Sequence, residues 1–215
     1  MNEKYKGTSP ITWPCFMLGS TSIEHFISSH NCNYPPFRMT ERSIELALAN
    51  IFLRKYQRES VVEIGAVTPY YWPHRIPTVV DPSDTHPQVL IRDSFLNFDL
   101  GGRPVLSIST FEHIGLPEYG LTADEFLQQE AVTKLLDNAG DFLVTIPGGY
   151  NPKLDQLIST IAQSNSFKLH VWQRYKYGND WIYLPDFKRI DFSQFSYGPF
   201  WANTLLVLHR GEDLI

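Results

Sequence analysis

The chain has 215 residues, of which 43% are hydrophobic and 19% charged, a balance typical of one globular domain with a large core. This composition excludes a disordered or fibrous chain. The formal net charge of -5 argues against duplex nucleic acid and anionic membrane surfaces as partners, because both bind basic protein surfaces.

Targeting and metal signals are missing from the sequence. The first ten residues, MNEKYKGTSP, have no apolar signal core, and no stretch approaches the ~20 apolar residues of a membrane span. Cys15 and Cys32 match neither a zinc spacing nor a disulfide framework, and the seven histidines are scattered. We therefore expect a cytoplasmic protein without a metal site; its oligomeric state does not follow from the sequence.

Residues 1–37 form a segment in which four prolines alternate with aromatic residues. Prolines at this density disfavour long regular elements, whereas the aromatic side chains indicate packing against another surface. We expect an extended arm with a short helix at residues 22–28. This arm either covers a sheet edge or forms a lid that shapes a substrate pocket.

The predicted main domain, residues 38–215, begins with a helix. From residue 44 to 52 apolar residues recur every three or four positions, and Thr40 is the candidate N-cap. Arg42 and Glu45 fall on the predicted solvated face of this helix. If its N-terminus faces a ligand crevice, Arg42 is a candidate contact for an anionic substrate.

Apolar, β-branched runs follow, and each ends in polar residues: SVVEIG, TVVD at residues 78–81, and RPVLSIST. Such runs predict strands buried on both faces of a parallel sheet, with a shorter strand at residues 89–91. Ligands of open α/β sheets bind at the carboxyl ends of the strands. There a carboxylate such as Asp81 can accept both hydroxyls of a ribose. The alternative is that Glu63 and Asp81 cap the following helices.

The run at residues 104–109 delivers Ser109, Thr110, Glu112 and His113 to the same crevice. Histidine titrates closest to neutrality, so His113 is a candidate general base whose ring a neighbouring carboxylate can orient. In the alternative interpretation Glu112 accepts hydrogen bonds from the loop backbone, and His113 only positions the cofactor and substrate.

The second half of the chain predicts two more helices around a fifth strand. Residues 121–140 read as a helix with Thr122 as its N-cap, followed by a strand that ends in IPGG. Tyr150 and Asn151 are candidate substrate contacts beyond this strand. Asn151 is alternatively the N-cap of a helix at residues 152–164, with Pro152 in its first turn.

The last part of the chain, residues 167–215, is dense in aromatic residues. Aromatic residues at this density more often build a terminal hairpin than a surface that stacks on sugars. The apolar run at residues 204–208 predicts the last strand of the sheet.

Four motifs in chain order resemble a known family: VVEIGAVTPYYWP, VVDPSD, LSISTFEHIG and LVTIPGGYNPKLD. They are similar to class I S-adenosylmethionine-dependent methyltransferases, and most to a branch found with sugar and surface-polysaccharide biosynthesis. FRMTERSIELALANIFL resembles the leading helix of that branch. The resemblance implies a Rossmann-like, three-layer α/β/α sandwich with a mostly parallel seven-stranded sheet and an antiparallel last strand.

The resemblance also implies roles for individual residues. Glu63 and Gly65 would hold the methionine part of the cofactor, Asp81 the ribose and Asp93 the adenine. The full set of implied cofactor contacts is Glu63, Gly65, Ala66, Asp81, Pro82, Asp93, Ser94, Ser109 and Thr110. His113 and Glu112 are the implied catalytic pair.

The implied function is methyl transfer from S-adenosylmethionine to a hydroxyl of a sugar or another small molecule. The alternative is a non-catalytic protein of the same fold that binds cofactor or carbohydrate as a partner subunit. Ala66 and Val67, which follow Gly65 where the broad superfamily is glycine-rich, favour this alternative. A nucleotide-sugar enzyme is disfavoured, because the chain has neither a Tyr-x-x-x-Lys pair nor a glycine-rich phosphate loop.

Overall fold

A computed structural model of the chain describes residues 41–124, 126–164, 166–175, 180–184 and 202–212, together with residues 17–18, 21–22, 191 and 195. A short antiparallel pair, β1 (Met17–Leu18) with β2 (Thr21–Ser22), lies in the N-terminal segment. The predicted helix at residues 22–28 falls outside the described residues except for Ser22, which belongs to β2. The predicted N-cap Thr40 lies outside them as well.

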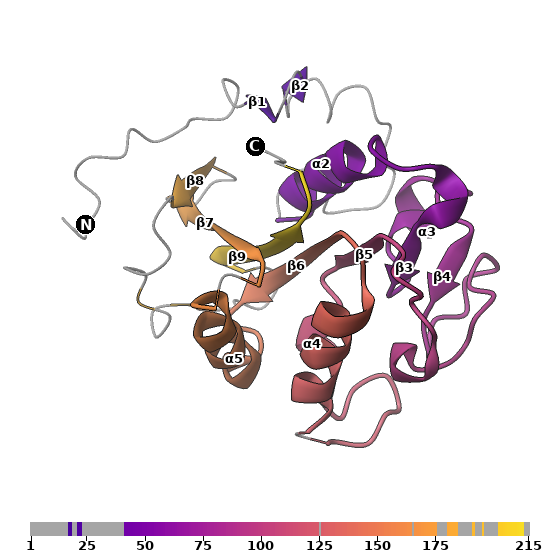
Figure 1. Cartoon of the computed structure of the whole chain (residues 1–215). Helices are drawn as coiled ribbons and strands as arrows, with labels where there is room; N and C mark the ends of the chain where they lie inside the picture. The colour runs from indigo at the N-terminus through magenta and orange to yellow at the C-terminus, as the bar shows by residue number, and fades with distance from the viewer. Residues whose placement is uncertain are drawn as a thin grey trace.

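The centre of the fold is a seven-stranded sheet with the order β4-β3-β5-β6-β9-β7-β8 (Figure 1). Its strands are β3 (Val62–Ile64), β4 (Thr78–Val80), β5 (Val105–Ile108), β6 (Phe142–Gly148), β7 (Lys168–Tyr175), β8 (Asp180–Leu184) and β9 (Thr204–Arg210). The first four strands of this order are parallel. β9 runs antiparallel to both β6 and β7, and β8 runs antiparallel to β7. The predicted α/β class, a seven-stranded sheet and the antiparallel last strand are confirmed; the sheet is mixed, with a parallel part from β4 to β6.

The strand predicted at residues 89–91 is reduced to a single bridge between Ile91 and Val80. The N–H of Val89 donates to the carbonyl of His86, which closes a turn in place of a strand. Leu90 is 78% exposed, so this segment buries too little apolar surface to form a full edge strand.

Helices cover both faces of the sheet (Figure 1). Helix α2 (Arg42–Leu53) packs Ile44, Leu48 and Phe52 against one face, whereas α4 (Leu127–Asn138) and α5 (Pro152–Ala162) cover the other. Successive strand residues point to opposite faces, so Leu106 joins the α2 core and Val105 the α4–α5 core. The predicted three layers are therefore confirmed. Short helical turns complete the fold: α3 (Thr68–Tyr71), η3 (Arg58–Ser60), η4 (Phe95–Asn97) and η5 (Phe111–His113).

Of two helix starts predicted from the sequence, one is confirmed and the other is wrong. The start of α5 is as predicted: Pro152 opens the helix, and the Asn151 side chain accepts a hydrogen bond from the Leu154 N–H at 3.3 Å. The start predicted at Thr122 is wrong, because α4 begins at Leu127. A backbone bond from Asp124 N–H to the Gly115 carbonyl ties this stretch into a loop instead.

The aromatic C-terminal segment, residues 167–215, forms a hairpin where it is described. β7 and β8 pair in register from Val171 with Leu184 to Tyr175 with Asp180. Trp172 and Trp181 are buried in the α2 core, as the hairpin interpretation predicts. No helix in the described ranges has the length and apolar character needed to cross a membrane.

Candidate functional site

A cleft with a volume of about 940 Å³ opens at the carboxyl ends of β3, β4 and β5. Strand β3 lies between β4 and β5, and the chain passes from β3 to β4 on one side before it reaches β5 on the other. Beyond the strand ends the two connections leave toward opposite faces of the sheet: the one after β3 packs with α2, and the one after β5 leads to α4. This arrangement leaves a crevice of the kind that binds ligands in open α/β sheets.

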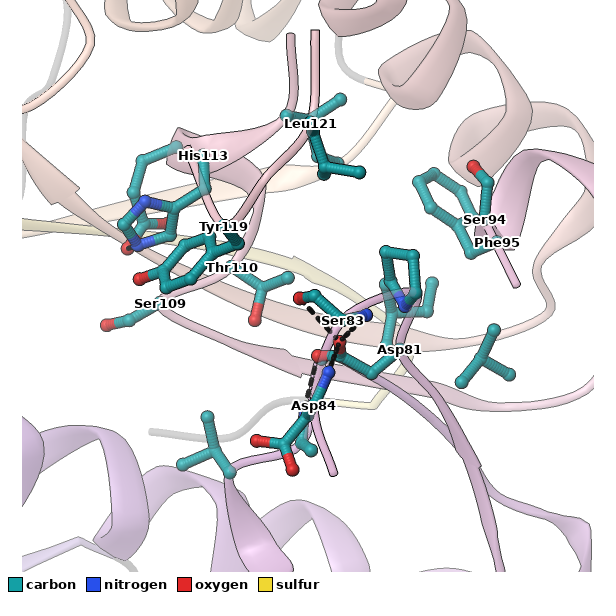
Figure 2. Close-up of a pocket in the computed structure, with 18 of the residues that line it drawn as sticks. Asp81, Ser83, Asp84, Ser94, Phe95, Ser109, Thr110, His113, Tyr119 and Leu121 are labelled. Atoms are coloured by element: carbon teal, nitrogen blue, oxygen red, sulfur yellow. Dashed lines mark hydrogen bonds and ion pairs between the residues drawn. The ribbon is translucent and has the colours of Figure 1, made fainter. Parts of the chain in front are cut away.

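The cleft has two ends that differ in chemistry, and Figure 2 shows Ser94 and Phe95 at one side with His113 and Tyr119 at the other. We call one the Asp81 end, which is lined by Gly65, Ala66, Asp81, Pro82, Ser94 and Phe95. We call the other the His113 end, which is lined by Arg42, Ser109, Glu112, His113, Tyr119 and Tyr150. Thr110 lies between the two. Eleven of the fourteen residues that the sequence singled out thus lie around one cleft.

Gly65 at the Asp81 end has no room for a side chain. Its φ of +83° favours glycine, and a Cβ at this position would lie 2.0 Å from Oγ1 of Thr110. The loop after β3 therefore packs directly on the loop after β5. This close packing brings the backbone of Ala66 to the cleft.

The Asp81 carboxylate links the loop after β3 to the loop after β4. Oδ2 accepts the Ala66 N–H at 3.1 Å, and Oδ1 accepts the N–H groups of Ser83 and Asp84 at 2.9 and 2.8 Å (Figure 2). Because each carboxylate oxygen has two acceptor positions, Oδ2 can still accept a hydrogen bond from a ligand.

Glu63 does not line the cleft, and its hydrogen bonds fit the capping alternative. Its buried carboxylate accepts hydrogen bonds from the N–H groups of Val67 and Thr68 and from the Thr68 hydroxyl, at the start of α3. Burial raises the pKa of Glu63 to about 7, although these hydrogen bonds oppose the rise. The side chain holds the loop after β3 from beneath.

Asp93 also lies outside the lining of the cleft. Its Oδ1 accepts hydrogen bonds from the Ser94 N–H and from the side chain of Asn97, and the residue is exposed. Ser94 lines the cleft, and its hydroxyl caps η4 by accepting the Leu96 N–H at 3.2 Å. The predicted adenine contact through Asp93 is therefore not supported.

His113 is held between two carboxylates. Its Nδ1 lies 2.5 Å from Oε2 of Glu118, and its Nε2 lies 3.6 Å from Oε1 of Glu112. Tyr119 and Tyr150 contact the ring edge-on, with centroids 5.2 and 4.8 Å away. Glu118 was not predicted from the sequence, because it lies in an irregular loop with no periodic spacing from His113.

Glu112 is a buried acid at the same end. The residue is 1% exposed, and among the described residues its Oε2 has no hydrogen-bond partner. Burial and the nearby charges of Glu45 and Glu41 hold the pKa of Glu112 well above its ordinary value. Burial likewise raises the pKa of Glu41 to about 7.

The expectation that Arg42 and Glu45 lie on a solvated face was wrong. Glu45 is fully buried and accepts the hydroxyls of Ser109 and Thr145 at 2.6 and 2.7 Å, while Arg42 lies 3.2 Å from its other oxygen. The first turn of α2 faces the ends of β5 and β6, where buried hydroxyls require partners. Arg42 lines the cleft as the partner of Glu45.

Tyr150 and Asn151 separate into two roles. The hydroxyl of Tyr150 lines the cleft and donates to Oε1 of Glu118 at 2.8 Å. Asn151 is 4% exposed and does not line the cleft, so its predicted substrate contact is not supported. Besides capping α5, its side chain donates to the carbonyl of Glu112 and so fixes η5.

Within the part of the chain that the structure describes, no group of three or more His, Cys, Asp or Glu side chains is arranged to hold a metal ion. Comparison of the chain with protein-family models, with curated proteins and with solved structures finds no match. The geometry of the cleft therefore carries the functional argument.

Proposed function

We propose that this protein transfers a methyl group from S-adenosylmethionine to a hydroxyl of a small acceptor, a sugar or a similar metabolite. The observation that carries the proposal is the combination of Asp81 and His113 in one cleft at the β3–β5 switch point. The sheet adds support, because an antiparallel β9 between β6 and β7 fits the class I methyltransferase topology.

The Asp81 end offers what an adenosine group needs. Oδ2 of Asp81 accepts a ribose hydroxyl, the backbone at Gly65 and Ala66 approaches the methionine part, and Phe95 provides apolar surface for the adenine. A cleft of about 940 Å³ is also large enough for a cofactor and a small acceptor together.

The charges around the cleft favour a cationic cofactor. Among the described residues that line it, the acidic ones are Glu41, Asp81, Asp84 and Glu112, and the one Arg or Lys is Arg42. Arg42 is itself paired with Glu45. Burial raises the pKa values of Glu41 and Glu112 and so reduces their charge, which leaves Asp81 and Asp84 to attract the positively charged sulfonium and to disfavour acceptors that carry phosphate groups.

The proposed reaction is a displacement at the methyl carbon. The acceptor oxygen forms a bond to that carbon as the carbon–sulfur bond breaks, and the electron pair of this bond leaves with the sulfur. The hydroxyl proton passes to Nε2 of His113. Because the sulfonium is already a good leaving group, the protein contributes alignment of the reactants and removal of this proton.

A second candidate is a non-catalytic protein that binds the cofactor or a carbohydrate. One observation favours it: the Asp81 carboxylate already accepts three backbone N–H groups, which leaves less capacity for a ribose. Methyl transfer separates the two candidates, because the second binds ligand without producing a methylated acceptor.

The test starts with thermal unfolding of the purified protein with and without S-adenosylhomocysteine. A ligand at about a hundred times its Kd adds roughly 2.7 kcal/mol and raises the midpoint of a domain of this size by about 5 to 10 °C. We expect this rise for the wild type and for the control Asp137→Asn, an exposed acid on α4. Asp81→Asn should weaken binding about tenfold or more, because a charge-assisted hydrogen bond is lost.

A flat result with millimolar ligand contradicts both the cofactor site and the proposed reaction. If the midpoint rises, incubation with S-adenosylmethionine carrying a labelled methyl group and a panel of sugars follows. Labelled product supports the methyltransferase, whereas ligand binding without product across the panel supports the non-catalytic candidate.

A further inference from the structure

The loop after η5 carries a carboxylate that reaches back to His113. Glu118 places Oε2 2.5 Å from Nδ1 of His113, and its Oε1 accepts the Tyr150 hydroxyl at 2.8 Å. Both oxygens of this side chain are thus used by the residues that surround the imidazole ring.

The backbone holds Glu118 in place through a series of short turns. The N–H of Leu116 donates to the carbonyl of His113, and the N–H of Glu118 donates to the carbonyl of Leu116. Gly115 permits this path, because its φ is +78° and a Cβ would lie 2.4 Å from the Asp124 carbonyl. The histidine and its carboxylate are therefore parts of one constrained loop.

We infer that Glu118 is the positioning residue of His113, fixing the proton of the neutral ring on Nδ1 and leaving Nε2 as the base that faces the cleft. The inference rests on the proposed function for its catalytic meaning. A carboxylate accepts hydrogen bonds and donates none, so at 2.5 Å from Nδ1 it selects the Nδ1–H tautomer. The same negative charge stabilises the imidazolium that forms when Nε2 takes the acceptor proton.

The other titratable groups around the ring are compatible with this assignment. Tyr119 and Tyr150 pack against its edges, and Glu112 faces Nε2 from η5. Behind Glu112 lie the charged groups at the start of α2, which are Glu41, Arg42 and Glu45. The hydrogen bonds from Tyr150 and His113 outweigh partial burial and hold the pKa of Glu118 below its ordinary value, so it stays a carboxylate at neutral pH.

The first experiment does not depend on enzymatic activity. Protein labelled with ¹⁵N-histidine is examined by NMR at about pH 8.5, and the His113 signals are identified by their loss in His113→Asn. We expect a protonated Nδ1 and an unprotonated Nε2 in the wild type. Glu118→Ala should shift the ring toward the Nε2–H tautomer, which free imidazole side chains favour. Glu118→Gln retains an acceptor oxygen and should keep the wild-type tautomer.

The second experiment measures methyl transfer against pH. In Glu118→Gln the rate on the high-pH plateau should fall about 10- to 100-fold. The pH of half-maximal activity should move down, because the neutral amide no longer stabilises the imidazolium. Glu130→Gln, at an exposed acid of α4, is the matched control and should reproduce the wild-type profile. Loss of folding alone would lower the rate without moving the profile.

The two readouts separate the inference from the proposed function. A wild-type ring protonated on Nε2, or a Glu118→Ala variant with an unchanged tautomer, overturns the role of Glu118 even if the protein methylates a sugar. An Nδ1–H ring that depends on Glu118 in a protein without methyl-transfer activity supports the positioning role and contradicts the reaction. If Glu118→Ala does not fold, the wild-type tautomer and the Glu118→Gln profile decide the question.

Discussion

The two ends of the cleft use carboxylates in opposite ways. At the Asp81 end both oxygens of Asp81 accept hydrogen bonds from the backbone of the loops after β3 and β4. At the His113 end Glu112 is buried with an oxygen that has no partner among the described residues, and the acids Glu41 and Glu45 lie nearby. The same functional group thus stabilises the fold at one end and opposes it at the other.

This difference matches what the two steps of the proposed reaction require. Binding a cofactor requires a rigid acceptor whose geometry does not depend on protonation. Moving a proton requires groups whose protonation can change, and burial raises the pKa of Glu41 to about 7 and that of Glu112 well above its ordinary value. We therefore expect variants at the Asp81 end to affect cofactor binding and variants at the His113 end to affect proton transfer, each with little effect on the other step.

The largest effect is expected for His113→Ala. Removing a general base lowers turnover by about 10²- to 10⁴-fold, whereas affinity for S-adenosylhomocysteine should change less than about twofold, because the Asp81 end is untouched. Turnover and Kd are measured on the same preparation. His74→Asn, at an exposed position with φ of +61° that Asn tolerates, is the control. Unchanged turnover in His113→Ala would remove this residue as the base.

The next effect concerns the close packing of the two loops at Gly65. In Gly65→Ala the new Cβ meets Thr110 at 2.0 Å and the residue keeps a positive φ, so we expect a loss of about 3 kcal/mol in the free energy of unfolding and weaker cofactor binding. Gly102→Ala is the matched control, because it has φ of +70° with no atom within 4 Å of the Cβ. Its free energy of unfolding should fall by only about 1 kcal/mol, the cost of placing alanine at a positive φ.

The comparison of these two glycine variants isolates the clash from the backbone strain. Chemical denaturation gives the free energies of unfolding, and titration with S-adenosylhomocysteine gives the affinities. Equal losses in the two variants would mean that the loop after β3 can move away from Thr110. The cleft would then not depend on this packing.

The sheet and the position of the cleft could be predicted because their signals are local. Runs such as VVEI and VLSI are apolar and β-branched, and polar residues follow them where strands end. Asp81 and His113 reached the cleft because each comes just after such a run. The fold prediction failed at residues 89–91, where one exposed leucine and a turn replaced a strand.

The partners of the site residues could not be predicted, because they come from contacts between distant or irregular segments. Glu45 lies on α2, one hundred positions from Thr145, and sequence periodicity assigned its polar side chain to solvent. Glu118 reaches His113 through a loop held by Gly115, which no helical or strand spacing reveals. Glu63 and Asp93 looked like ligand contacts because an acid that accepts hydrogen bonds from its own loop and an acid that binds a ligand occupy the same position in sequence.

The smallest effects come from replacing an acid by its amide at each end of the cleft, and they compare the two ends most directly. At pH 8 Asp81→Asn should destabilise the fold by about 1 to 2 kcal/mol, because an amide loses acceptor positions for backbone N–H groups. Glu112→Gln should instead stabilise it by about 1 to 2 kcal/mol, because it removes an ionisable group that burial disfavours in its charged form. Thermal and urea unfolding at pH 8 measure both.

The pH dependence of the Glu112→Gln effect carries a definite sign. The pKa of Glu112 is raised in the folded protein above the ordinary value of 4.5, so the folded chain binds the proton more tightly than the unfolded chain. The contribution of Glu112 to the free energy of unfolding of the wild type therefore increases as the pH falls from its folded-state pKa toward about 4.5. The stability advantage of the glutamine variant should vanish at about pH 4.5. If the variant is less stable than the wild type at pH 8, the Glu112 carboxylate has partners that satisfy its charge. The two ends of the cleft would then hold their acids in the same way.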